Sequence, residues 1–266
     1  MKRFIALAVV GLSFTVNTLA QDWAKARLEK SPRHLEWVKI KQGDREVNTF
    51  IAFPEVKEKA PAVVLIHEIF GLTDWVRGVA DQLAEQGYIA IAPDLLSGAA
   101  PGGGGTAELG GADAVRKAIS SLQPNQITAD LDAVAAYATK LPACDGKLAV
   151  AGFCWGGAQS FRFATHAPQI KAAFVFYGTA PNDTGSLSAI RCPVYGFYGG
   201  NDARVSATIP NTEESMKKEG KQYQPVTYEG AGHGFMRAGE APDAKPSDKQ
   251  ARDAAWKRWL EVLKKL

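Results

Sequence analysis

Residues 152–157, Gly-Phe-Cys-Trp-Gly-Gly, place Cys154 between glycines at the junction of two predicted elements. The apolar residues before them, 147–151, predict a buried parallel strand, and residues 158–166 favour a helix. Such a turn strains the backbone at Cys154, while the glycines let strand and helix approach closely, and the helix N-terminus favours a thiolate. The pattern predicts a nucleophilic cysteine; the alternative is a buried structural cysteine beside a glycine-rich turn.

An acid and a histidine follow, each just after a predicted strand. Asp202 follows the apolar run 193–199, and His233 lies in a glycine-rich loop after residues 223–228. Because ligand crevices lie outside the carboxyl ends of strands in open α/β sheets, we expect both side chains to meet Cys154 there. The chain order of nucleophile, acid and histidine is that of α/β-hydrolases. Singly, Asp202 is explained equally well as a turn residue and His233 as a polar residue at a helix start; together they predict a Cys-His-Asp triad.

A second carboxylate, Glu68, follows the apolar run 61–66 and His67, so it belongs at the same end of the sheet. The backbone N–H of Ile69, just after this strand, is placed to pair with that of Trp155 as an oxyanion hole. The alternative for Glu68 is a solvated loop acid.

These motifs together resemble the dienelactone hydrolase family, over roughly residues 35–266. The resemblance rests on residues 67–71 and 152–157, on Asp202, and on residues 232–235. It implies an α/β-hydrolase fold and an enzyme of the carboxymethylenebutenolidase type, which cleaves small esters or lactones through a Cys154–His233–Asp202 triad and a thioacyl-enzyme. It also implies that Glu68 contacts the resting thiol and releases the thiolate when substrate binds.

The same resemblance implies that arginines hold the substrate carboxylate. Arg237, four residues after His233, matches one such position, where partial burial would be needed for a charge-assisted bond. The alternative is a solvated loop arginine. The second position falls at Ser97-Gly98-Ala99, where this chain has no arginine. This departure argues against dienelactone itself as the substrate and leaves the hydrolase chemistry intact.

Strand and helix patterns alternate along the chain. Residues 35–40 and 46–53 predict an antiparallel edge hairpin, with further strands at 62–67, 88–92, 172–176, 194–198 and 223–228. Helices are expected at 74–86, 128–140, 212–220 and 247–264. The alternation predicts a doubly wound, mostly parallel sheet with helices on both faces, and we expect residues 21–266 to form a single domain.

The glycine-rich stretch 98–111 predicts a flexible loop at the carboxyl end of a strand. An active-site flap and a plain surface insertion both fit this pattern. It is not a phosphate-binding loop, because no Lys-Ser/Thr follows at the required spacing.

The first 20 residues combine Lys2-Arg3, an apolar run and a small-residue site ending at Ala20. This pattern predicts a secretory signal peptide, so the protein is expected to be exported, periplasmic or secreted, and free of the membrane after cleavage. A retained N-terminal anchor is the alternative.

Export bears on the other two cysteines, Cys144 and Cys192, which both lie at predicted strand starts. With Cys154 as the free nucleophile, they are a candidate disulfide pair in an oxidising compartment.

A thiol-redox or small-molecule binding protein that does not hydrolyse esters is the alternative function, although the chain has no C-x-x-C pair. A non-enzymatic relative would not be expected to keep Glu68, Cys154, Asp202 and His233 together.

The charge balance gives no sign of a nucleic-acid partner. The chain carries 31 Lys and Arg against 28 Asp and Glu, with no dense basic patch, and loss of Lys2 and Arg3 with the leader lowers the net charge further. The four histidines have no metal-ligand spacing, so we expect no metal or other cofactor. The expected protein is a monomer acting on a small molecule.

Overall fold

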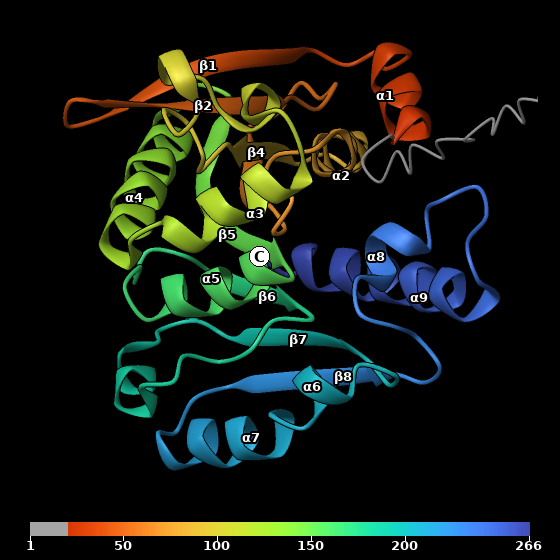
Figure 1. Cartoon of the computed structure of the whole chain (residues 1–266). Coiled ribbons are helices and arrows are strands. Elements are labelled where there is room, and N and C mark those ends of the chain that lie inside the picture. The colour runs from red at the N-terminus through yellow and green to blue at the C-terminus, as the bar shows by residue number, and fades with distance from the viewer. Residues whose placement is uncertain (1–20) are drawn as a thin grey trace, which may run out of the picture.

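The computed structural model describes residues 21–266. Eight strands in this part of the chain form one sheet, which lies at the centre of the fold (Figure 1). The strands lie in the order β1-β2-β4-β3-β5-β6-β7-β8. Their bounds are β1 Leu35–Gln42, β2 Arg45–Ala52, β3 Ala60–Ile66, β4 Ile89–Pro93, β5 Cys144–Phe153, β6 Ala172–Phe176, β7 Val194–Gly199 and β8 Tyr223–Tyr228. Every neighbouring pair from β4 to β8 is parallel, whereas β2 runs antiparallel to both β1 and β4. The predicted mostly parallel sheet with an antiparallel edge hairpin is confirmed.

The strand order changes direction between β3 and β5. The chain passes from β3 to β4 on one side and then returns to place β5 on the other side of β3. A crevice opens at such a switch point, outside the carboxyl ends of the two strands. The residues that follow β3 and β5 therefore face the place where an α/β protein of this kind binds its ligand.

Helices cover both faces of the sheet, as predicted. The bounds are α1 Asp22–Glu29, α2 Asp74–Glu85, α3 Ala112–Ser121, α4 Pro124–Lys140, α5 Trp155–Ala164, α6 Ala203–Ser206, α7 Ile209–Lys218, α8 Phe235–Ala238 and α9 Pro246–Leu263. Alternate residues of β3 enter two separate cores, because successive strand side chains point to opposite faces. Val63 and Leu65 pack with α2 and α9, whereas Val64 and Ile66 pack with α4 and α5.

Aromatic packing fixes the end of β5. Phe153, the last strand residue, is fully buried and contacts Trp75 and Phe176, with ring centroids 4.9 Å apart in each pair. Trp259 of α9 packs edge-on against Phe176 at the same distance. Because buried aromatic clusters tolerate little displacement, the turn after Phe153 has a rigid base.

The main differences from the predicted elements lie in helices. The four helices α1, α3, α6 and α8 were not predicted, and α4 begins at Pro124 rather than near residue 128. Proline is favoured in the first turn of a helix because its missing N–H has no partner there in any case. The short helices α6 and α8 span four residues each, too few for a hydrophobic period to appear in the sequence.

The hypothesis of a Cys144–Cys192 disulfide is wrong. All three cysteines are free, and Cys144 and Cys192 are buried. Cys144 begins β5 and Cys192 lies just before β7, with β6 between these two strands. Two strand spacings separate such positions by roughly 10 Å. A disulfide needs its Cα atoms within about 7 Å.

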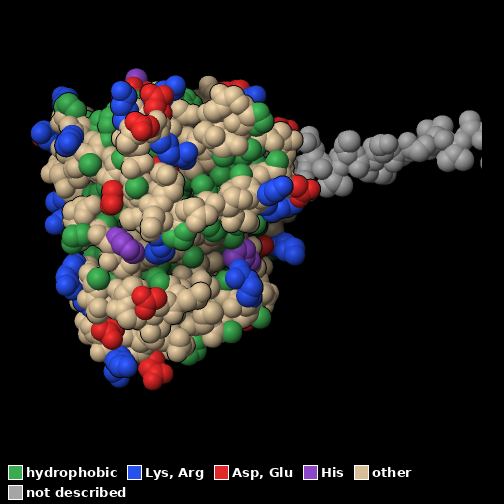
Figure 2. Space-filling view, turned by 60° about the vertical axis from the view of Figure 1, so that its left-hand side comes forward, with side chains coloured by type: hydrophobic (Ala, Val, Ile, Leu, Met, Phe, Trp, Pro, Cys, Tyr) green, Lys and Arg blue, Asp and Glu red, His purple; other side chains and the backbone are tan. Residues whose placement is uncertain are grey.

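The predicted signal peptide, residues 1–20, lies outside the described residues. Within residues 21–266, no helix has both the length and the apolar composition needed to cross a membrane. Figure 2 shows basic and acidic side chains interspersed over the face it presents, without a large patch of either sign.

Candidate active site

Cys154 lies in a strained turn between β5 and α5. Its φ is +57°, a conformation that non-glycine residues rarely adopt. The glycines beside it permit a close backbone approach: a Cβ on Gly156 would lie 2.3 Å from the carbonyl oxygen of Ile66, and one on Gly152 would lie 1.9 Å from that of Gly156. The predicted turn is therefore present, and it brings Cys154 to the switch point beside the end of β3.

We expect Gly156→Ala to destabilise the fold. The added methyl meets backbone oxygens rather than a mobile side chain, so the free energy of unfolding should fall by about 2–3 kcal/mol or more. Urea denaturation measures this change. Gly78→Ala in α2 is the control, since no atom lies within 4 Å of its Cβ position. There the better helix propensity of alanine should add about 0.5–1 kcal/mol. Equal stability of the two variants would contradict the close approach.

The structure brings the three predicted triad side chains together. His233 Nε2 lies 3.1 Å from Cys154 Sγ, and His233 Nδ1 lies 2.5 Å from Asp202 Oδ2. Since a carboxylate accepts the proton of Nδ1–H, the lone pair of Nε2 faces the thiol. His233 can therefore accept the thiol proton without moving.

Long-range contacts hold the acid and the histidine in place. Asp202 is buried at the start of α6, where its side chain also accepts from the Val205 N–H. The His233 loop is fastened to α9, because the Gly232 N–H donates to Asp248 Oδ1 at 2.9 Å. The ring of Tyr177 packs edge-on against His233, with centroids 5.1 Å apart. The imidazole is thus held from two sides.

The pKa of the Cys154 thiol is raised by its surroundings. Burial, followed by the negative charge of Glu68, raises the pKa of Cys154 to about 11. The backbone N–H groups of Trp155 and Ile69, which lie near the sulfur, lower this pKa, as does the charge of Arg204. The two N–H groups chosen from the sequence as an oxyanion pair therefore converge beside the sulfur.

Glu68 pairs with Arg237, whereas the resemblance implied a contact with the thiol. Arg237 Nε donates to Glu68 Oε2 at 2.7 Å, and the guanidinium lies 5.3 Å from the centre of the Phe70 ring. Burial raises the pKa of Glu68, and the charge of Arg237 opposes this shift. A buried carboxylate gains more from a guanidinium than from a neutral thiol, which explains the pairing. Arg237 is partly buried, as its binding role required, but its charge already has a partner.

We expect Glu68→Gln to make Cys154 more reactive. Losing the negative charge lowers the pKa of Cys154, so more thiolate exists at pH 8 and iodoacetamide should alkylate it roughly three- to tenfold faster. The rate is followed by mass spectrometry of the peptide that contains Cys154. Glu46→Gln, an exposed acid on β2, is the control. An unchanged or slower rate in Glu68→Gln would show that this carboxylate does not restrain the thiol.

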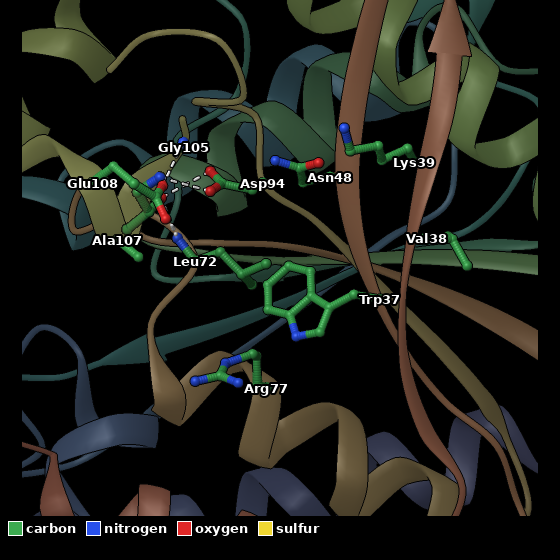
Figure 3. Close-up of a pocket in the computed structure, with 11 residues that line it drawn as sticks. Trp37, Val38, Lys39, Asn48, Leu72, Arg77, Asp94, Gly105, Ala107 and Glu108 are labelled. Atoms are coloured by element: carbon green, nitrogen blue, oxygen red, sulfur yellow. Dashed lines mark hydrogen bonds between the residues drawn. The ribbon is translucent and has the colours of Figure 1, made fainter. Parts of the chain in front are cut away.

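The glycine-rich stretch 98–111 is anchored to the turns that follow β3 and β4. Both the N–H and the hydroxyl of Thr106 donate to the Asp94 carboxylate, at 2.7 and 2.8 Å, and the Thr106 hydroxyl accepts from the Leu72 N–H at 3.0 Å. Residues 105–108 line a cavity of about 520 Å³ together with Trp37 and Arg77 (Figure 3). None of the stretch lines the cavity beside Cys154. Of the two predictions, this arrangement favours the surface insertion over the active-site flap.

His67 is a contributor that the sequence reasoning did not single out. It is fully buried, its Nδ1 lies 2.9 Å from the Glu68 carbonyl oxygen, and its Nε2 accepts from the Leu95 N–H. Its ring stacks on Trp155 at 5.5 Å. Burial lowers the pKa of His67, so the ring is neutral and ties the turns after β3, β4 and β5 together.

The cavity beside Cys154 holds about 230 Å³. Besides the cysteine, its lining is Ile69, Trp155, Ala158, Tyr177, Gly178, Thr179, Arg204 and Val205. This volume is below the usual range for drug-sized ligands and suits a small acyl group. In the described part of the chain, no group of three or more His, Cys, Asp or Glu side chains is arranged to hold a metal ion.

The chain matches a known protein family. Residues 47–266 match the model of the dienelactone hydrolase family. A protein of Methylorubrum extorquens named as a carboxymethylenebutenolidase is 31% identical over 233 residues, 83% of this chain and 77% of the relative. One of Salmonella typhimurium with the same name is 31% identical over 234 residues, 83% of each chain.

Solved structures of similar proteins share the fold of this chain. A crystal structure described as a dienelactone hydrolase of Klebsiella pneumoniae superposes with a TM-score of 0.77 at 26% identity, covering 88% of this chain and 99% of that one. A dienelactone hydrolase-like promiscuous phosphotriesterase from metagenomic libraries shares the fold, with a TM-score of 0.74 at 22% identity over 88% and 98% of the two chains. The chain therefore belongs to the dienelactone hydrolase family and is a hydrolase of the carboxylic ester class.

Proposed function

We propose that this protein hydrolyses small carboxylic esters or lactones through a thioacyl-enzyme on Cys154. One observation carries the proposal: the hydrogen-bonded chain from Cys154 through His233 to Asp202 opens onto a small cavity. The converging N–H groups of Ile69 and Trp155 add a site for a developing oxyanion.

In the first half of the reaction, His233 Nε2 takes the thiol proton as Cys154 Sγ attacks the carbonyl carbon. The carbonyl oxygen becomes an oxyanion, which the N–H groups of Ile69 and Trp155 stabilise. When the tetrahedral intermediate collapses, the C–O bond breaks and His233 returns its proton to the departing alkoxide. The acyl group remains on the sulfur as a thioester.

In the second half, His233 removes a proton from water, which attacks the thioester carbonyl. Collapse of this second intermediate breaks the C–S bond, releases the acid and restores the thiol with the proton from His233. Asp202 keeps the imidazole oriented and stabilises its charged form in both halves.

The nucleophile also limits the substrate class. A thiolate leaves a tetrahedral intermediate more readily than an ordinary alkoxide, so the first intermediate returns to substrate unless the alkoxide also leaves easily. Activated esters, enol esters and lactones meet this condition, whereas amides do not.

A substrate panel tests the proposal. The protein should hydrolyse p-nitrophenyl acetate and small enol lactones, and it should cleave p-nitroacetanilide far more slowly. Protein whose Cys154 has first been alkylated with iodoacetamide should be inactive on every member. If the protein hydrolyses none of the esters, or if it keeps full activity after alkylation of Cys154, the proposed function is wrong.

We further propose that the protein is exported and acts as a monomer. The support for export is the pattern of residues 1–20. Amino-terminal sequencing of protein recovered from a periplasmic fraction should begin at Gln21, and light scattering should give the mass of one chain. Recovery of the uncleaved chain in the cytoplasm would contradict export.

A further inference from the structure

One charged side chain lines the cavity beside Cys154, and it is not the arginine indicated by the family resemblance. Arg204 lies on α6, two residues after Asp202, and is exposed. No other residue that lines this cavity is a lysine, an arginine or an acid, and Arg237 is not among the lining residues.

Arg204 differs from Arg237 in having no ionic partner. Arg237 is bound to Glu68 at 2.7 Å, whereas within residues 21–266 no carboxylate lies within salt-bridge distance of Arg204. The positive charge of Arg204 also reaches the reacting atom, since it lowers the pKa of Cys154. An unpaired guanidinium at the wall of a catalytic cavity is free to bind an anion.

We propose that Arg204 binds an anionic group of the substrate and so selects small esters or lactones that carry a carboxylate. The planar guanidinium matches a carboxylate in two parallel hydrogen bonds, which a neutral ester lacking that group cannot form. The cavity of about 230 Å³ keeps the whole substrate small. This inference rests on the proposed function, because it assigns specificity to the same site.

Matched substrates measure the effect. Mono-p-nitrophenyl glutarate and p-nitrophenyl pentanoate differ mainly in a terminal carboxylate. In the wild type, kcat/KM should favour the glutarate, and added salt should weaken the preference because Arg204 is exposed. Arg204→Gln should lower the glutarate-to-pentanoate ratio about tenfold, mainly through KM, as expected for losing a charge-assisted hydrogen bond. Arg204→Lys should retain part of the preference.

The control is Arg116→Gln, which removes an exposed arginine of α3 paired with Asp113. It should keep the wild-type ratio. An unchanged ratio in Arg204→Gln overturns the proposal. So does a ratio that falls only in Arg237→Gln, because the anion site would then be Arg237.

A second measurement does not depend on turnover. Iodoacetate and iodoacetamide alkylate the same sulfur with loss of iodide and differ in charge. The ratio of the iodoacetate rate to the iodoacetamide rate at Cys154 should be lower in Arg204→Gln than in the wild type. In Arg116→Gln it should equal the wild-type ratio. If neither ester is hydrolysed, the proposed function fails, and the alkylation ratio still decides whether Arg204 attracts anions to Cys154. A constant ratio in Arg204→Gln would contradict the role of Arg204.

Discussion

Cys154→Ala protein is expected to hydrolyse p-nitrophenyl acetate at least about a thousandfold more slowly than the wild type, because it lacks the atom that receives the acyl group. The loss should appear in kcat, since the cavity lining and the two N–H groups of the oxyanion site remain. Steady-state kinetics over a range of ester concentrations separates kcat from KM.

The chain offers a matched control for this variant. Cys192→Ala makes the same chemical change at a buried cysteine just before β7, at the other end of the sheet. It should keep the wild-type kcat, whatever its effect on stability. Comparable rates for Cys154→Ala and the wild type would exclude Cys154 as the nucleophile and would favour a thiol-redox or binding role.

His233→Gln is expected to lower kcat/KM by about two to four orders of magnitude at pH 7, the range of general-base catalysis. Without the imidazole, the reaction depends on thiolate formed by bulk solvent. The pKa of Cys154, raised to about 11, leaves little thiolate at neutral pH. That fraction grows tenfold with each pH unit below the pKa, so the defect should shrink as the pH rises towards 10.

A pH–rate profile from pH 6 to pH 10 measures this behaviour. His166→Gln, which changes an exposed histidine just beyond α5, should retain the wild-type profile. A defect in His233→Gln that stays constant across the pH range would show that the imidazole does not act by removing the thiol proton.

The sequence was sufficient to predict that Cys154, Asp202 and His233 lie close together, because parallel sheets impose a strong rule. Strands of one direction end at one edge, so residues that follow apolar runs lie along that edge. Cys154, Asp202 and His233 each follow such a run, and the glycines around Cys154 mark the close approach of β5 and α5. Local pattern and global topology agree at these positions.

Side-chain pairing across the fold was beyond the reach of sequence reasoning. Glu68 and Arg237 lie 169 residues apart, and their ion pair depends on how α8 packs beside the end of β3. The Cys144–Cys192 hypothesis failed because the strand order, which places β6 between them, does not follow from the strand pattern.

Two further features depend on tertiary structure. The stretch 98–111 is held by the hydrogen bonds between Asp94 and Thr106. No periodic pattern in the sequence predicts this contact. Arg204 was missed because α6 is a single turn, so its position two residues after Asp202 was the only signal.

The most direct test of the account is the identification of the acylated residue. After rapid mixing with p-nitrophenyl acetate and acid quenching, peptide mass spectrometry should find one acetyl group on Cys154. It should form in a burst matching the enzyme concentration, be removed by neutral hydroxylamine and be absent from Cys154→Ala. Active protein with an unmodified Cys154, or with the acetyl group on another side chain, would contradict the thioacyl mechanism.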